Sequence, residues 1–147
     1  MGTVSVIPSI IIKVNKMTDI LTIQQNFELA ESIEEKFQLL VKLSKNLSIP
    51  IDKNPSVVVD LNTCEYNISV LGFKSDAKVY YYFSSNSVLI KGFLAIISEM
   101  FCGKTRSEIV SGSVELFNKI NFGPYFTFKT KELISKIFEI IKKIAEE

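Results

Sequence analysis

The chain has 147 residues, of which 47% are hydrophobic, and a formal net charge of +1 at neutral pH. This length and apolar content are typical of one globular domain with a sizeable core. Acidic and basic residues are interspersed along the sequence. The charge pattern therefore argues against nucleic acid and against an anionic membrane surface as partners.

The sequence contains no histidine. This absence excludes histidine general bases, Cys-His and Ser-His nucleophile pairs, and histidine-ligated zinc. The two cysteines, Cys64 and Cys102, are too few for a disulfide framework or for a metal site built from four thiolates. A reducing compartment is therefore expected, and any nucleophilic chemistry is expected to be that of sulfur.

Residues 1–17 are interpreted as an N-terminal extension of unassigned role, and residues 18–147 as a single domain. The apolar run over residues 4–12 is interrupted by Pro8 and is too short to span a bilayer. No acidic residue precedes Asp19, which faintly resembles a trimmed transit peptide, but an additional strand or a start at Met17 is favoured. We expect a cytoplasmic protein. The alternative is a plastid-type or other organelle in an AT-rich host. Arg106 is the only arginine among the basic residues, and such a preference for lysine is typical of AT-rich codon usage.

Hydrophobic spacing predicts helices at both ends of the domain and strands between them. Apolar residues three to four apart predict a helix over residues 20–30, and a capping box at Ser32 begins a second helix that ends before Pro50. The period then changes, and three segments are typical of strands, the last two joined as a hairpin: residues 57–59, 66–73 and 77–83.

The second half of the chain returns to helical spacing. A cap cluster over residues 84–87 begins a buried helix, which Gly103 is expected to end in a left-handed turn. Thr105 and Glu108 form a second capping box, and the last helix is predicted from Thr130. The order of elements predicts an α+β domain with a small antiparallel sheet of about three strands flanked by helices.

Cys64 is the candidate nucleophile. It precedes the apolar segment 66–70, so it is predicted at a junction between a loop and a strand. A thiolate is the strongest nucleophile that this chain offers at neutral pH, although a buried structural thiol is an equal alternative on these residues alone. Cys102 falls at a predicted helix end, where the dipole raises the pKa of a thiol, and is expected to be structural.

Four segments between about residues 28 and 144 resemble the SufE family of sulfur-acceptor proteins. Residues 35–43, EKFQLLVKL, are similar to the family pattern E-x-Y-x-x-L-I-x-L, and Cys64 with Ile68 falls where the family has G-C-x-S-x-V-W. Residues 85–95, SNSVLIKGFLA, are similar to S-D-A-x-I-V-K-G-L-x-A, and residues 103–109 match G-K-T-x-x-E-I. The Lys-Gly pair at positions 91 and 92 is the most specific of these features.

The resemblance implies a fold shared with the IscU-type scaffold proteins and a role in iron–sulfur cluster assembly. It implies that Cys64 accepts persulfide sulfur from a SufS-like, pyridoxal-phosphate-dependent cysteine desulfurase and passes it on, with a cluster scaffold complex as a further partner. Such a protein is a sulfur-transfer accessory rather than a stand-alone enzyme. It needs no cofactor or metal of its own, and neither nucleic acid nor a membrane is expected as a partner. An IscU-like scaffold is disfavoured because a cluster needs more ligands than this chain has.

The resemblance also implies docking residues. Asparagine stands where the family has an aspartate and threonine where it has an arginine; the predicted docking residues are Asn86, Lys91, Lys129, Thr130 and Lys131. Around Cys64, the family glycine is replaced by Thr63, for which we expect ordinary backbone angles. Two alternatives remain: a non-catalytic desulfurase-binding partner with weakened transfer, or a generic α+β interaction domain.

Overall fold

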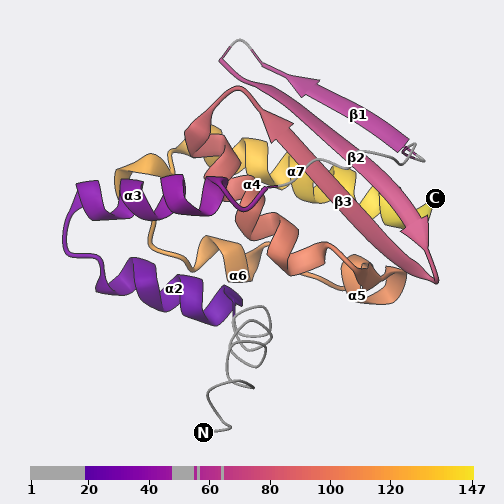
Figure 1. Ribbon diagram of the computed structural model, residues 1–147, viewed down its shortest axis with the longest axis horizontal. Helices are drawn as coiled ribbons and strands as arrows, with labels where there is room; N and C mark the ends of the chain where they lie inside the picture. The colour runs from indigo at the N-terminus through magenta and orange to yellow at the C-terminus, as the bar shows by residue number, and fades with distance from the viewer. Residues whose placement is uncertain (1–18, 48–54, 56, 64) are drawn as a thin grey trace, which may run out of the picture.

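The structure is a computed structural model that describes residues 19–47, 55, 57–63 and 65–147 (Figure 1). Two helices are followed by three long strands and then by a helical C-terminal half. The elements are α2 Asp19–Leu29, α3 Ile33–Ser44, β1 Val57–Asn62, β2 Asn67–Ser75, β3 Lys78–Ser85, α4 Val88–Phe101, β4 Lys104–Thr105, α5 Arg106–Val110, α6 Glu115–Asn118, the 3-10 helix η1 Gly123–Tyr125, and α7 Phe128–Glu146.

The strands form one antiparallel sheet in the order β1-β2-β3-β4. Side chains at alternate positions of β2 and β3 are buried, including Ile68, Val70, Tyr81 and Phe83. The helices α4 and α7 lie on the same side of the sheet in Figure 1, so this buried face is the one they cover. The prediction of an α+β domain with a small antiparallel sheet is confirmed.

Two of the differences between the structure and the sequence prediction have a local explanation. A two-residue strand, β4, adds a fourth strand by pairing Lys104 with Val79 of β3, and no hydrophobic pattern marks so short a segment. The last helix begins at Phe128 rather than at Thr130, because the Thr127 hydroxyl accepts a hydrogen bond from the Thr130 amide at 3.2 Å.

Capping groups fix the helix ends that the sequence predicted. The Ser32 hydroxyl accepts from the Glu35 amide, while the Glu35 carboxylate reaches the amide of Glu31 rather than that of Ser32. Thr105 and Glu108 form the full reciprocal box. Gly103 adopts φ +80°, which is the left-handed turn expected after α4. Local chemistry therefore decides where these helices begin and end.

Helix α4 is the centre of the core. It packs against α3 on one side and β3 on the other, and its residues Ile90, Phe93, Leu94, Ile96 and Ile97 are fully buried. At Gly92 the two helices approach so closely that a Cβ atom would lie 2.8 Å from the Leu40 carbonyl oxygen and 3.0 Å from its Cβ. Gly92 is therefore required by the contact between α3 and α4 rather than by its own backbone angles.

Lys36 of α3 connects the first helix to the C-terminal half. Its side chain is 9% exposed, and its Nζ donates to the carbonyl oxygens of Phe27 at 3.0 Å and Asn121 at 2.7 Å. These bonds satisfy a buried ammonium group without a carboxylate.

Within the described residues, no helix is long and apolar enough to cross a membrane.

We predict that Gly92→Ala destabilises the protein by about 1–3 kcal/mol, because the added methyl group overpacks the contact with Leu40. Urea unfolding followed by circular dichroism measures the change. Val88→Ala, at an exposed position of the same helix, is the matched control and should change stability by less than about 0.5 kcal/mol. Equal stability of Gly92→Ala and wild type would show that α3 can move away without cost.

Candidate functional site

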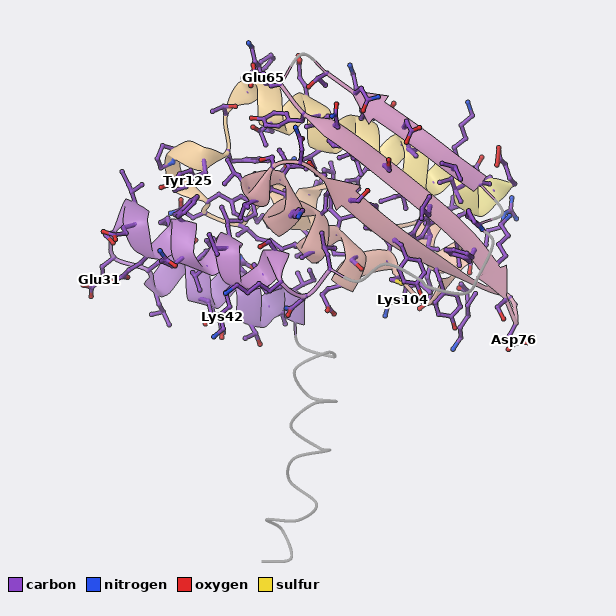
Figure 2. All side chains as sticks on the ribbon, turned by 45° about the horizontal axis from the view of Figure 1, so that its top comes forward. Glu31, Lys42, Glu65, Asp76, Lys104 and Tyr125 are labelled. Carbon is purple, nitrogen blue, oxygen red and sulfur yellow. The ribbon has the colours of Figure 1, made fainter. Side chains whose placement is uncertain are left out.

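Cys64 lies outside the described residues, but its neighbours Thr63 and Glu65 are described. They belong to the connection between β1 and β2, whose last paired residues are Asn62 and Asn67. In Figure 2 the label of Glu65 lies at the edge of the molecule, beside the start of α7. The candidate site is therefore built from the described residues of this connection and from the elements that they contact.

A cavity of about 330 Å³ separates the β1–β2 connection from α7. The connection contributes the lining side chains Thr63, Glu65 and Tyr66. The helix contributes Lys129, Glu132, Leu133 and Lys136. The lysines and glutamates are equal in number, so their formal charges balance. The floor is apolar, since Leu133 is 6% exposed. The cavity thus combines an apolar base with a charged rim beside position 64.

Thr63 closes the connection into a turn. Its Oγ1 accepts hydrogen bonds from the amides of Tyr66 at 2.9 Å and Glu65 at 3.2 Å, and its own amide donates to the Tyr66 carbonyl at 2.8 Å. Among the described residues that are not glycine, only Asp76 and Ala77 have positive φ. Thr63 therefore has the ordinary backbone angle predicted for it, and the glycine of the family pattern is not needed here.

Asn86 fixes the base of the connection. Its Oδ1 accepts from the Asn67 amide at 2.9 Å, and its own amide donates to the Asn67 carbonyl at 3.3 Å. Because Asn86 lies just before α4, this pair joins the start of β2 to the start of the central helix. Asn86 is thus brought to the end of the sheet where the connection lies, although it does not line the cavity. Lys91, one turn into α4, does not line it either.

The start of α7 carries the other three predicted docking residues, and they differ in exposure. Lys129 is highly exposed and its Nζ lies 3.7 Å from Glu65 Oε1, an ion pair of the kind that contributes little stability in water. Lys131 is exposed. Thr130 is 4% exposed, and its hydroxyl lies 3.0 Å from that of Thr127 within the helix cap. The structure thus places Thr130 inside the fold, where its side chain does not form a docking surface.

Tyr66 has a raised pKa. Burial is the main cause, and the neighbouring Glu65 carboxylate adds to it. The phenol is therefore protonated at neutral pH. Tyr66 supplies no negative charge to the site.

Cys102 is held by the backbone of β3. It is the C-cap of α4, where its Sγ accepts from the Tyr81 amide at 3.4 Å and donates to the Tyr81 carbonyl at 3.5 Å. Burial raises the pKa of the Cys102 thiol, so at neutral pH the group is a protonated thiol and a poor nucleophile. The position at the helix end is as predicted, but burial rather than the helix dipole is the main cause of the raised pKa.

The sequence analysis named Lys129 but missed the other lining residues of α7, Glu132, Leu133 and Lys136, and one exposed aromatic residue. Lys129, Glu132, Leu133 and Lys136 recur at the spacing of one helix face, which the sequence does show. It does not show that the β1–β2 connection lies against that face. Phe128 is 75% exposed at the first position of α7. An aromatic residue at a helix start carries no sequence signal for such exposure.

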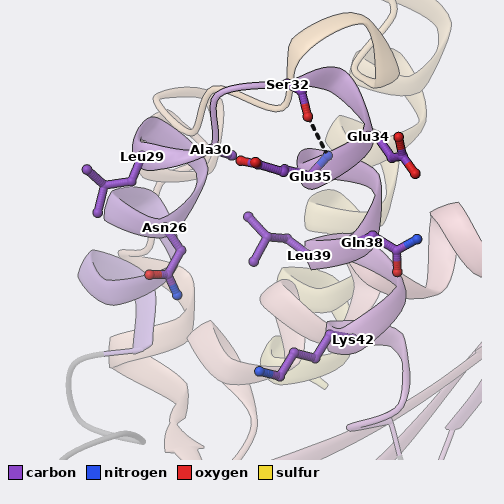
Figure 3. A pocket seen from close by; sticks show the side chains of 9 residues that line it. All are labelled: Asn26, Leu29, Ala30, Ser32, Glu34, Glu35, Gln38, Leu39 and Lys42. Atoms are coloured by element: carbon purple, nitrogen blue, oxygen red, sulfur yellow. Dashed lines mark hydrogen bonds between the residues drawn. The ribbon is translucent and has the colours of Figure 1, made fainter.

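A larger groove lies elsewhere, between α2 and α3, with a volume of about 620 Å³ (Figure 3). Its lining includes Leu29, Leu39 and Lys42 but no thiol. In the part of the chain that the structure describes, no group of three or more Cys, Asp or Glu side chains is arranged to hold a metal ion. The smaller cavity beside position 64 therefore remains the candidate site.

The sequence is similar to proteins of one known family. Residues 21–145 match SufE, described as an Fe-S metabolism associated domain. The chain belongs to the SufE family. A similar curated protein is the cysteine desulfuration protein SufE of Wigglesworthia glossinidia brevipalpis, which is 29% identical over 135 residues, covering 89% of this chain and 92% of that protein. The family resemblance of the four sequence segments is thereby confirmed.

The fold is also found in a solved structure. The solution structure of a hypothetical protein from Thermus thermophilus has a TM-score of 0.71 with this chain at 13% sequence identity. The likeness covers 90% of this chain and 94% of the other. At this identity the likeness shows the fold alone.

We predict that Cys102 reacts slowly with an alkylating reagent in the folded protein. Its raised pKa means that the folded state holds the thiol proton more tightly than the unfolded chain. The resulting stabilisation is complete below the ordinary thiol pKa and is lost as the pH rises through the raised value. Timed alkylation followed by peptide mass spectrometry should therefore show labelling of Cys102 only at alkaline pH or in urea. Labelling at neutral pH as fast as in the unfolded chain would contradict this assignment.

Proposed function

We propose that this protein accepts persulfide sulfur on Cys64 from a cysteine desulfurase and carries it to iron–sulfur cluster assembly. One observation carries the proposal: the SufE match extends across Cys64, and the residues on both sides of this cysteine line a cavity against α7. The name of the similar Wigglesworthia protein, cysteine desulfuration protein, supports the same chemistry. Cys102 does not compete for the role, because its thiol is hydrogen-bonded and its pKa is raised.

The transfer is an exchange between a thiolate and a persulfide. The Cys64 thiolate attacks the outer sulfur of the persulfide on the desulfurase, forming a new S–S bond as the old one breaks. The electron pair of the broken bond leaves on the desulfurase cysteine as a thiolate, and the transferred sulfur keeps its proton or releases it to water. No net oxidation or reduction occurs, so neither a metal nor a redox cofactor is required of this chain. Cys64-persulfide is then the carrier that a cluster-building complex unloads.

The start of α7 supplies a surface for docking beside the site. Phe128 offers an exposed apolar ring, and Lys129 and Lys131 offer flexible positive charge around it. Aromatic residues surrounded by polar ones are common anchors of protein interfaces. Lysine supplies charge without the bidentate geometry of arginine. The geometry of the contact would therefore be less strictly defined than with the arginine of the family. A desulfurase with an acidic patch near its persulfide loop fits this surface.

We predict that incubation with a cysteine desulfurase and cysteine adds sulfur atoms to the peptide that contains Cys64. Mass spectrometry of the intact protein and of its peptides measures the addition. The Cys64→Ser variant should take up none, whereas Cys102→Ser should behave as wild type, because Cys102 is not a nucleophile in the folded state. Sulfur found only on the Cys102 peptide would overturn the assignment. Binding to the desulfurase without any sulfur on Cys64 would instead support a non-catalytic partner.

We predict that Lys129→Ala/Lys131→Ala weakens binding to the desulfurase roughly three- to tenfold at low salt, since each exposed contact is modest. Isothermal titration calorimetry at low and high salt measures the effect, which should shrink as salt screens the charges. The matched control is Lys74→Ala/Lys78→Ala, which removes the same charge. These two lysines lie beside the β2–β3 turn, at the end of β2 opposite to the β1–β2 connection. An unchanged Kd for the first variant at low salt would exclude these lysines from the interface.

A further inference from the structure

Among the described residues of the β1–β2 connection, the Thr63 side chain accepts more backbone hydrogen bonds than any other. Thr63 Oγ1 accepts from the amides of Glu65 and Tyr66, and the Thr63 amide donates to the Tyr66 carbonyl. These three bonds run from the residue before position 64 to the two residues after it. They join the described residues on the two sides of position 64.

The ends of this turn are fixed to separate parts of the fold. Beyond Tyr66, Asn67 is bonded to Asn86 at the start of α4, and Glu65 pairs with Lys129 of α7. The Asn67–Asn86 pair includes a bond between two backbone groups and holds the base of the connection. The Glu65–Lys129 pair is exposed and weak. Among the described residues of the turn, the Thr63 hydroxyl is therefore the side-chain group that restricts the backbone, beside the bond from the Thr63 amide to the Tyr66 carbonyl.

Thr63 also faces the cavity. It lines the space together with Tyr66, one of the two residues whose amide it binds. A change that releases this amide would move Tyr66 relative to Leu133 and Lys136 on the opposite wall. The turn and the shape of the cavity are thus coupled through one hydroxyl group.

We infer that Thr63 is a positioning residue for sulfur transfer. Its hydroxyl holds the residues on the two sides of Cys64 relative to one another, so the desulfurase meets flanking residues that hydrogen bonds already position. This inference rests on the proposed function for the identity of the reaction. Without the hydroxyl, the turn would have to be ordered during each encounter, and transfer would be slower. Thr63 acts on the reaction through the turn and does not touch the transferred sulfur.

Three variants separate this role from a general effect on folding. Thr63→Val keeps the shape and removes the hydroxyl, Thr63→Ser keeps the hydroxyl, and Thr105→Val removes a comparable capping hydroxyl at α5, away from the site. In Thr63→Val, hydrogen exchange at the amides of Glu65 and Tyr66 should be about tenfold faster, since each loses its bond. The kcat/KM of sulfur transfer should fall about fivefold or more, with thermal stability close to that of Thr105→Val.

A small alkylating reagent provides a readout that needs no desulfurase. Releasing the turn increases the number of directions from which residue 64 can be approached, so alkylation of Cys64 in Thr63→Val should be about threefold faster or more. Thr63→Ser should restore exchange, alkylation and transfer to within about twofold of wild type. Thr105→Val should leave all three at the wild-type values.

The two proposals fail in different ways. Accelerated exchange in Thr63→Val with unchanged transfer and alkylation would overturn the positioning role and leave the proposed function standing. Failure of the wild-type protein to take sulfur from cysteine desulfurases would overturn the proposed function, while exchange and alkylation would still decide whether Thr63 controls position 64. Slow transfer in Thr63→Ser equal to that of Thr63→Val would show that the hydroxyl is not the cause.

Discussion

The close contact between α3 and α4 at Gly92 determines the rest of the arrangement. A side chain at this position would meet the Leu40 backbone, so the two helices can approach to this distance only with glycine. Helix α4 is then enclosed by α3 on one side and β3 on the other, and its apolar stripe is fully buried. Because interiors are close-packed, a shift at this contact would be passed on to every element that α4 touches.

The position of the candidate site follows from this core. Asn86 lies at the start of α4 and is bonded to the first residue of β2, so the central helix fixes one end of the β1–β2 connection. The opposite wall is placed by α7, which is tied to the sheet where the buried Tyr81 hydroxyl donates to the Ile141 carbonyl at 2.7 Å. Burial raises the pKa of Tyr81, so this donor keeps its proton. The cavity beside position 64 thus lies between the β1–β2 connection and α7, and different contacts with the core hold each of them in place.

The environments of the two cysteines suit different roles. Cys102 exchanges hydrogen bonds with the Tyr81 backbone, which suits a structural role, and burial raises the pKa of its thiol, which lowers its reactivity. The residues around Cys64 are instead exposed or half-buried and are arranged by side-chain bonds that a partner can replace. A sulfur carrier needs this division, because a second reactive thiol would attack the persulfide that it carries.

The sequence by itself determined the α+β class, the capping residues Ser32 and Thr105, the turn at Gly103 and the family, because each depends on local spacing or on residue type. It also made Cys64 rather than Cys102 the candidate nucleophile. The placement of Gly92 against Leu40, the burial of Thr130, the short strand β4 and the cavity between the β1–β2 connection and α7 depended on contacts between segments far apart in the chain. Thr63 illustrates the boundary: the sequence showed that glycine was replaced, and only the tertiary structure showed that the new hydroxyl binds the backbone across position 64. Local patterns determine which elements form, whereas close packing decides which side chains share a site.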